Sequence, residues 1–205
     1  MKNIRVAVDV GGTFTDIVIM DENTGAIRIE KTSSTPDDPM LAILNGIEQG
    51  GIDLSKVSMF SHGTTVATNA LIQRNLPRTA MICTEGFRDV VEIRRANKED
   101  LWDTYKDVAK PYVARRDRLV VKECVDANGA VLEALDEVEA LRVAKVLKKR
   151  EVASVAICFM NSYTNGANEE RMREIMQSVM PDIPISISSQ VLPEIFEHER
   201  FSTTM

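Results

Sequence analysis

The chain has 205 residues, 44% of them apolar, which is enough for one large domain or two small ones with a sizeable core. Its net charge of −6 at pH 7 argues against a nucleic-acid-binding protein, because such a protein normally presents a basic face. No apolar run approaches the length that spans a bilayer, and the N-terminus passes directly into a strand pattern without a signal-peptide pattern. We therefore expect no membrane segment and a cytoplasmic location.

Three cysteines, Cys83, Cys124 and Cys158, lie far apart in or beside apolar runs. Their spacing is not that of a metal site. We expect them to be reduced and mostly buried.

Residues 4–31 are predicted to form three antiparallel strands joined by short turns. Residues 4–10 alternate between apolar and polar side chains, residues 17–20 are a continuous apolar run, and residues 26–31 alternate again. Strands joined in this way form a meander. Residues 9–16, Asp-Val-Gly-Gly-Thr-Phe-Thr-Asp, connect the first two strands.

The glycine pair in this connection predicts an anion-binding turn. Gly11 and Gly12 permit positive φ and place no Cβ in the way of a ligand, and successive N–H groups in such a turn can form a nest. Hydroxyl groups and carboxylates flank the pair: Thr13, Thr15, Asp9 and Asp16. Carboxylates beside a phosphate suit Mg²⁺, which keeps several waters and takes one or two carboxylates. The turn therefore predicts a nucleotide triphosphate site with Mg²⁺, the alternative being a plain hairpin turn.

A helix is predicted after the meander. Asp38 precedes Pro39 as a cap precedes the first helical residue, and Gly50-Gly51 ends the pattern. The expected apolar face consists of Leu41, Leu44 and Ile47, with Ile43 beside them.

A second candidate site follows a short predicted strand at residues 57–61. Residues 62–65 read His-Gly-Thr-Thr and lead into a helical segment, with Gly63 permitting a sharp strand-to-helix turn. The carboxyl edge of an α/β sheet is where ligands usually bind, so His62, Thr64 and Thr65 are candidate site residues. The alternatives are helix capping by the threonines and a structural hydrogen bond from His62.

A third cluster of charges follows the predicted strand at residues 78–84. Glu85 or Asp89 could act as a base and Arg88 or Arg95 could bind an anion, the alternative being surface charge pairs. Residues 94–117 are predicted to be an irregular insertion, either a lid or a partner contact.

The remainder alternates between strands and helices, with strands expected at 119–125, 151–159 and 183–188 and helices at 136–150, 168–180 and from 194. This order predicts an α/β fold with a mixed sheet and helices on both faces. A first meander that carries a phosphate turn is how actin-like ATPases and sugar kinases begin.

An ordered set of motifs extends the similarity along the whole chain. The set comprises the stretch 9–16, His-Gly-Thr-Thr-Val-Ala-Thr-Asn-Ala at 62–70, Thr-Glu-Gly-Phe-Arg-Asp at 84–89, Asn-Ser-Tyr at 161–163, Leu-Pro-Glu at 192–194 and Glu-Arg-Phe-Ser-Thr-Thr at 199–204. Together they resemble the N-terminal region of the hydantoinase A/5-oxoprolinase family, which includes N-methylhydantoinase A and acetone carboxylase β-type subunits.

The resemblance implies an actin-like (ribonuclease H-like) ATPase fold, ATP and Mg²⁺ as cofactors, and a small cyclic amide or ketone as substrate. ATP would activate the carbonyl oxygen of the substrate by phosphorylation. Asp9 would act through Mg²⁺, with Asp16 supporting the metal site. The cleft would be lined by His62 and Thr64 as catalytic groups and by Thr65, Asn69, Glu85 and Arg88 as substrate contacts. A hydantoinase B-like second subunit is a possible partner.

The chain departs from the family pattern at two points. Gly166-Ala167-Asn168 stands where the family tends to have a Pro-His pair, and Arg94-Arg95 stands where it tends to have glycine before arginine. Family members are also much longer, so residues 1–205 are expected to be an incomplete part of an ATPase-fold protein. A sugar-kinase-like phosphotransferase and a non-catalytic nucleotide-binding module remain alternative functions.

Overall fold

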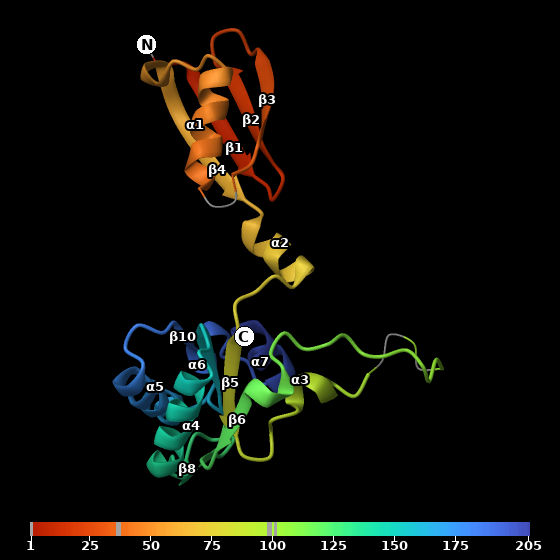
Figure 1. Ribbon diagram of the computed structural model, residues 1–205, viewed down its shortest axis with the longest axis vertical. Coiled ribbons are helices and arrows are strands. Elements are labelled where there is room, and N and C mark those ends of the chain that lie inside the picture. The colour runs from red at the N-terminus through yellow and green to blue at the C-terminus, as the bar shows by residue number, and fades with distance from the viewer. Residues whose placement is uncertain (1, 36–37, 98–99, 101) are drawn as a thin grey trace. The chain divides into compact units, whose positions relative to one another are not determined.

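The computed structural model describes residues 2–35, 38–97, 100 and 102–205. These residues divide into two compact units, residues 1–76 and 77–205, each with its own four-stranded sheet, and the second unit also contains a two-stranded sheet (Figure 1).

The first unit is a four-stranded mixed sheet in the order β3-β2-β1-β4. Its elements are β1 (Ile4–Val10), β2 (Phe14–Asp21), β3 (Ile27–Ser33), α1 (Pro39–Gln49), the 3-10 helix η1 (Leu54–Lys56), β4 (Val57–Thr64) and α2 (Val66–Gln73). Strands β1, β2 and β3 pair antiparallel and β4 pairs parallel to β1. The predicted three-stranded meander is confirmed.

Helix α1 lies across one face of this sheet (Figure 1). Asp38 caps it as predicted, because its carboxylate accepts a hydrogen bond from Met40 N at 3.1 Å. The predicted apolar face is wrong in part, since Leu41 and Leu44 are exposed. The buried residues are Ala42, Ile43, Gly46 and Ile47.

Gly46 explains why the helix buries this face and not the predicted one. A Cβ at Gly46 would lie 2.0 Å from Ile17 Cδ1, so the helix turns its smallest residue toward the sheet and approaches it closely. The resulting core consists of Val6, Val8, Val10, Ile17, Ile19, Ile43 and Ile47.

Strand β4 is longer than predicted. It continues through Thr64, because residues 62–64 pair with residues 8–10 of β1. Gly63 therefore lies within the strand opposite Asp9, and the change from strand to helix occurs at Thr65.

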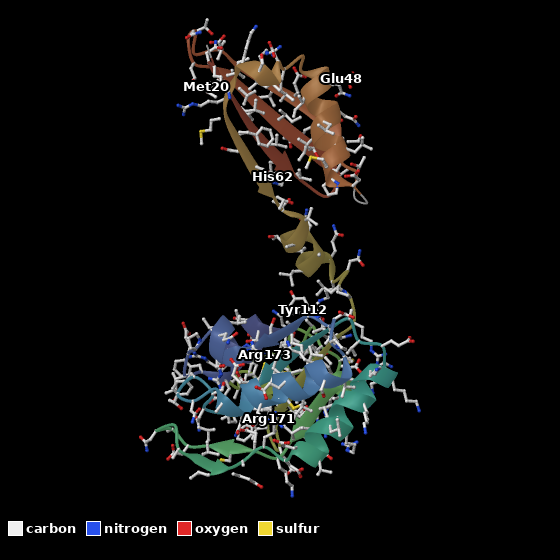
Figure 2. All side chains as sticks on the ribbon, turned by 90° about the vertical axis from the view of Figure 1, so that its left-hand side faces the viewer. Met20, Glu48, His62, Tyr112, Arg171 and Arg173 are labelled. Carbon is white, nitrogen blue, oxygen red and sulfur yellow. The ribbon has the colours of Figure 1, made fainter. Side chains whose placement is uncertain are left out.

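The other face of the first sheet carries exposed apolar side chains. Met20 lies on this face and Glu48 lies on α1, on opposite sides of the unit (Figure 2). The side chain of Met20 is exposed, and so are those of Val18, Ile27, Ile29 and Met59. Helix α1 packs on the opposite face of the sheet, and the core of this unit forms between that face and the helix.

The second unit is built on a parallel sheet in the order β10-β9-β5-β6. Its elements are β5 (Thr79–Thr84), α3 (Val90–Ile93), η2 (Arg115–Asp117), β6 (Arg118–Val121), β7 (Cys124–Val125), β8 (Val131–Glu133), α4 (Glu137–Lys149), β9 (Ser154–Cys158), α5 (Ala167–Val179), β10 (Ile185–Ile187), α6 (Ser188–Val191) and α7 (Glu197–Thr204). The α/β class is confirmed by both units, although one continuous sheet was expected.

Helices cover both faces of the second sheet (Figure 1). Alternate residues of β5 enter two cores: Ala80 and Ile82 pack with α4 and α5, and Met81 and Cys83 pack with α3 and α7. Such burial on both faces is the reason that the parallel strands read as continuous apolar runs.

The three cysteines are free, with Cys83 and Cys158 buried and Cys124 half-buried, as predicted. Burial raises the pKa of the Cys83 thiol to about 12, so this thiol stays protonated at neutral pH.

Residues 94–97, 100 and 102–114 contain no helix or strand, and Trp102 and Tyr105 are almost fully exposed. The proposed insertion at 94–117 includes residues 98, 99 and 101, which lie outside the described part of the chain. Among the described residues, no helix has the length and apolar character needed to cross a membrane.

Candidate functional site

The glycine turn closes the hairpin between β1 and β2. Gly11 N donates a hydrogen bond to Phe14 O at 3.0 Å. A Cβ at Gly11 would lie 2.8 Å from that same carbonyl oxygen, so this position requires glycine. A Cβ at Gly12 would lie 3.3 Å from Asn69 Nδ2, so a side chain there would press on α2.

The tip of the turn offers hydrogen-bond donors. Neither Gly12 N nor Thr13 N has a backbone partner among the residues that the structure describes, whereas Thr13 O accepts from Ser34 N at 2.9 Å. Two successive free N–H groups beside a side-chain-free backbone are the elements of an anion nest. The turn is therefore suited to a phosphate oxygen.

The hydroxyl of Thr15 stabilises the turn through hydrogen bonds and does not lie at its tip. Thr15 is fully buried on the α1 side of the sheet, and its Oγ1 lies 3.0 Å from Ser34 Oγ. Ser34 Oγ in turn donates to Gly11 O at 2.8 Å. These hydrogen bonds hold the turn in place. Any effect of Thr15 on a ligand would therefore pass through the backbone of the turn.

A cavity of about 440 Å³ opens beside the turn. Its polar lining includes Gly11, Gly12 and Thr13 from the turn and Asn69 from α2. Four further polar residues line it that the sequence analysis did not identify: Ser34, Thr35, Gln73 and Asn75. Ser34 and Thr35 belong to the hydroxyl-rich loop after β3, whereas Gln73 and Asn75 lie at and just after the end of α2.

Helix α2 is attached to the turn by backbone and side-chain bonds. Thr65 N donates to Val10 O at 3.1 Å, and Asn69 Nδ2 donates to Thr65 Oγ1 at 3.3 Å. The Thr64 hydroxyl donates to Val10 O at 3.1 Å and accepts from Val66 N at 3.2 Å. The cap residue of α2 is Thr65, whose side chain makes no cap bond, so Thr64 bonds the first helical N–H from one position earlier and both of its hydroxyl bonds are structural.

Asp9 and Asp16 oppose each other directly across the β1–β2 pair. Like charges at directly opposite positions repel. Lys31 Nζ lies 3.1 Å from Asp16 Oδ1 and compensates that carboxylate. Asp9 is exposed and forms no ion pair with any described residue, so an added cation would relieve the repulsion.

The pair of Asp9 and Asp16 suits Mg²⁺ better than it suits a metal ion whose ligands all come from the protein. Within the described residues, no group of three or more His, Cys, Asp or Glu side chains could hold a metal ion. Mg²⁺ needs only one or two carboxylates when waters and phosphates complete its octahedron. Asp9 and Asp16 do not line the cavity, since they occupy the sheet face opposite α1 at the end that carries the turn.

The other predicted site residues lie elsewhere. His62 is exposed on β4 opposite Val8 and does not line the cavity. It is labelled in Figure 2. Glu85 and Arg88 belong to the second unit, where they follow β5. The cavity of the first unit therefore brings together the glycine turn and Asn69 but not His62, Glu85 or Arg88.

The comparison with known families identifies this chain. The model for the hydantoinase/oxoprolinase N-terminal region matches residues 5–180. The chain belongs to the hydantoinase/oxoprolinase family. The α subunit of caprolactamase from Pseudomonas jessenii is 33% identical over 214 residues, covering 100% of this chain and 31% of the relative. An uncharacterized protein from Methanocaldococcus jannaschii, MJ0964, is 38% identical over 98% of this chain and 30% of its own length.

Solved structures of this hydantoinase/oxoprolinase family share the fold. Nucleotide-free acetone carboxylase matches with a TM-score of 0.86 and 25% identity, over 100% of this chain and 32% of the matched chain. The ATP-dependent caprolactamase of Pseudomonas jessenii matches with a TM-score of 0.84, over 98% of this chain and 30% of the matched chain. The chain thus spans about a third of the length of these relatives.

Proposed function

We propose that this chain is the phosphate-binding N-terminal part of an ATP-dependent enzyme that activates a cyclic amide or a ketone by phosphorylating its carbonyl oxygen. The observation that carries the proposal is the glycine turn at a polar cavity, where the N–H groups of Gly12 and Thr13 have no backbone partner in the described part of the chain. Relatives that match the whole chain are named as a caprolactamase subunit and an acetone carboxylase subunit, and the related structures are described as ATP-dependent.

Each part of the turn has a separate task in this proposal. The amides of Gly12 and Thr13 hold phosphate oxygens, and Asn69 limits the room above Gly12. Asp9 would hold Mg²⁺, which would supply positive charge to neutralise the phosphates. His62, Thr65, Glu85 and Arg88 remain proposed substrate-side residues, to be completed by the rest of the protein.

The proposal is tested by nucleotide hydrolysis with the full-length gene product and a panel of hydantoins, 5-oxoproline, lactams and ketones. We expect one of these classes to stimulate ATP hydrolysis and to be consumed in proportion. Stimulation by a sugar, with sugar phosphate as the product, would instead support a phosphotransferase.

We also propose cytoplasmic placement and a partner subunit. The relatives named above include an α subunit and a β subunit, which indicates that proteins of this family assemble with others. Co-purification of the full-length product with a hydantoinase B-like chain encoded beside it would test the partner.

We expect the isolated chain to bind Mg²⁺-ATP only weakly, with Kd near 1 mM, or about −4 kcal/mol. A few phosphate hydrogen bonds contribute only ~0.5–1.5 kcal/mol each while partly exposed to water. They must also offset the several kcal/mol lost on immobilising the ligand. Calorimetry with Mg²⁺-ATP measures this directly. Micromolar binding or steady turnover by residues 1–205 would show that the site is complete within them.

A further inference from the structure

The second unit contains a cavity of about 460 Å³ at the carboxyl ends of two parallel strands. Gly86 and Phe87 follow β5, and Met160 follows β9; all three line it. The remaining walls come from α3, the residues directly after it, and the start of α7. This edge of a parallel sheet is where α/β folds usually bind ligands.

Arg94 has an unusual backbone at this cavity. Its φ is 58° and its ψ is −133°, a backbone conformation that residues other than glycine rarely adopt. A strained backbone persists where the surrounding structure imposes it, and such positions cluster at ligand sites. Here the strained position places an arginine side chain in the lining of the cavity.

The guanidinium of Arg94 is incompletely paired. Its Nη1 atom is buried and has no hydrogen-bond partner among the described residues. A buried donor of a charged group without a partner is costly, so an incoming acceptor would relieve that cost. His198 Nδ1, which belongs to another lining residue, is buried and unpaired in the same way.

Several other charges at the cavity are paired. Arg95 lies 2.6 Å from Glu199 Oε1 and over the ring of Phe196 at 4.0 Å, while Glu199 Oε2 is buried and has no partner among the described residues. Asp89 accepts two hydrogen bonds from Arg115 at 2.9 Å, and these bonds hold the pKa of Asp89 below its usual value. Glu197 is the remaining carboxylate of the lining. Of the two arginines in the lining, Arg95 has an ion pair, whereas Arg94 has none with the residues that the structure describes.

We propose that this cavity binds a small organic monocarboxylate, with the carboxylate on Arg94 and the apolar body along Phe87, Ile93 and Met160. A planar guanidinium binds a planar carboxylate through two parallel hydrogen bonds. The apolar walls suit an aliphatic or aromatic body, as is usual in small-molecule pockets. Glu197 and Glu199 disfavour a phosphate dianion at the same place.

This site lies within residues 77–205 and goes beyond the proposed nucleotide function, on which it does not rest. No feature of the glycine turn bears on it.

Binding of hexanoate, benzoate and inorganic phosphate to the 205-residue chain tests the inference, by calorimetry and by chemical-shift changes of residues 86–95. We expect saturable binding of hexanoate or benzoate and none of phosphate. Arg94→Gly should weaken carboxylate binding at least about tenfold while raising the thermal midpoint, because glycine relieves the backbone strain. Arg94→Gln should weaken binding similarly without that rise.

Arg142→Gln is the matched control, because Arg142 is exposed on α4 and paired with Glu139. It should leave carboxylate binding unchanged. Unaltered binding in both Arg94 variants, no saturable carboxylate binding by the unmodified chain, or phosphate binding tighter than that of hexanoate would each overturn the proposal.

Discussion

Replacing Asp9 with alanine is expected to abolish Mg²⁺-ATP-dependent turnover by the full-length gene product, with a loss of about 10³-fold or more. A metal ion on the phosphates supplies several kcal/mol of transition-state stabilisation, and each ~1.4 kcal/mol is a factor of ten. The fold should survive, because Asp9 is exposed on a sheet and its removal ends the repulsion with Asp16. Turnover and the Mg²⁺ concentration at half-maximal rate are the quantities to measure.

Glu48→Ala is the matched control for Asp9→Ala. Glu48 is an exposed carboxylate on α1 of the same unit, visible on the side of the sheet away from Met20 (Figure 2). Its loss removes one negative charge without touching the turn, so activity should remain. Full turnover in a folded Asp9→Ala protein would show that this carboxylate does not serve the metal.

Glu169→Ala is expected to lower the free energy of unfolding of the second unit by ~3 kcal/mol or more. The Glu169 carboxylate is fully buried and accepts hydrogen bonds from Phe159 N at 2.8 Å, Ser188 Oγ at 2.6 Å and Ser189 N at 2.8 Å. It ties α5 to the end of β9 and the start of α6. Its removal leaves Phe159 N without its acceptor in a buried site and takes one partner each from Ser188 Oγ and the half-buried Ser189 N, at a cost of ~1–3 kcal/mol for a buried donor left unsatisfied.

Thermal and urea unfolding of the 205-residue chain measure this effect, and we expect the midpoint of the second unit to fall by roughly 10 °C. Glu174→Ala on the same helix is the control, because the exposed Glu174 carboxylate pairs only with Arg171 among the described residues. Its effect should stay within ~0.5 kcal/mol. Equal midpoints for the two variants would contradict a structural role of the buried carboxylate.

The candidate site was predictable from the sequence only in its local parts. Gly11 and Gly12 predicted the turn, because the conformational freedom of the backbone is a property of the glycine residue itself. The positions of the hydroxyls needed the structure. Thr15 points to the buried side of the sheet since strand side chains alternate, and the Thr64 hydroxyl bonds Val10 O and Val66 N.

Residues far apart in the sequence were the ones missed. Ser34 reaches Gly11 across 23 positions, and Gln73 and Asn75 reach the cavity beside the turn from the end of α2. The buried carboxylates of Glu123 and Glu169 had no local signal, because both lie in segments whose pattern is otherwise ordinary. Only packing decides that such side chains meet.

The sequence by itself determined the meander, the glycine turn, the Asp38 cap and the alternation of strands and helices in the second half. Each depends on contacts within a few residues or on a period of 2 or 3.6. Tertiary structure decided the division into two sheets, the face that α1 buries through Gly46, and the strained backbone that places Arg94 at a cavity. These features arise from close packing between distant segments, which no local pattern encodes.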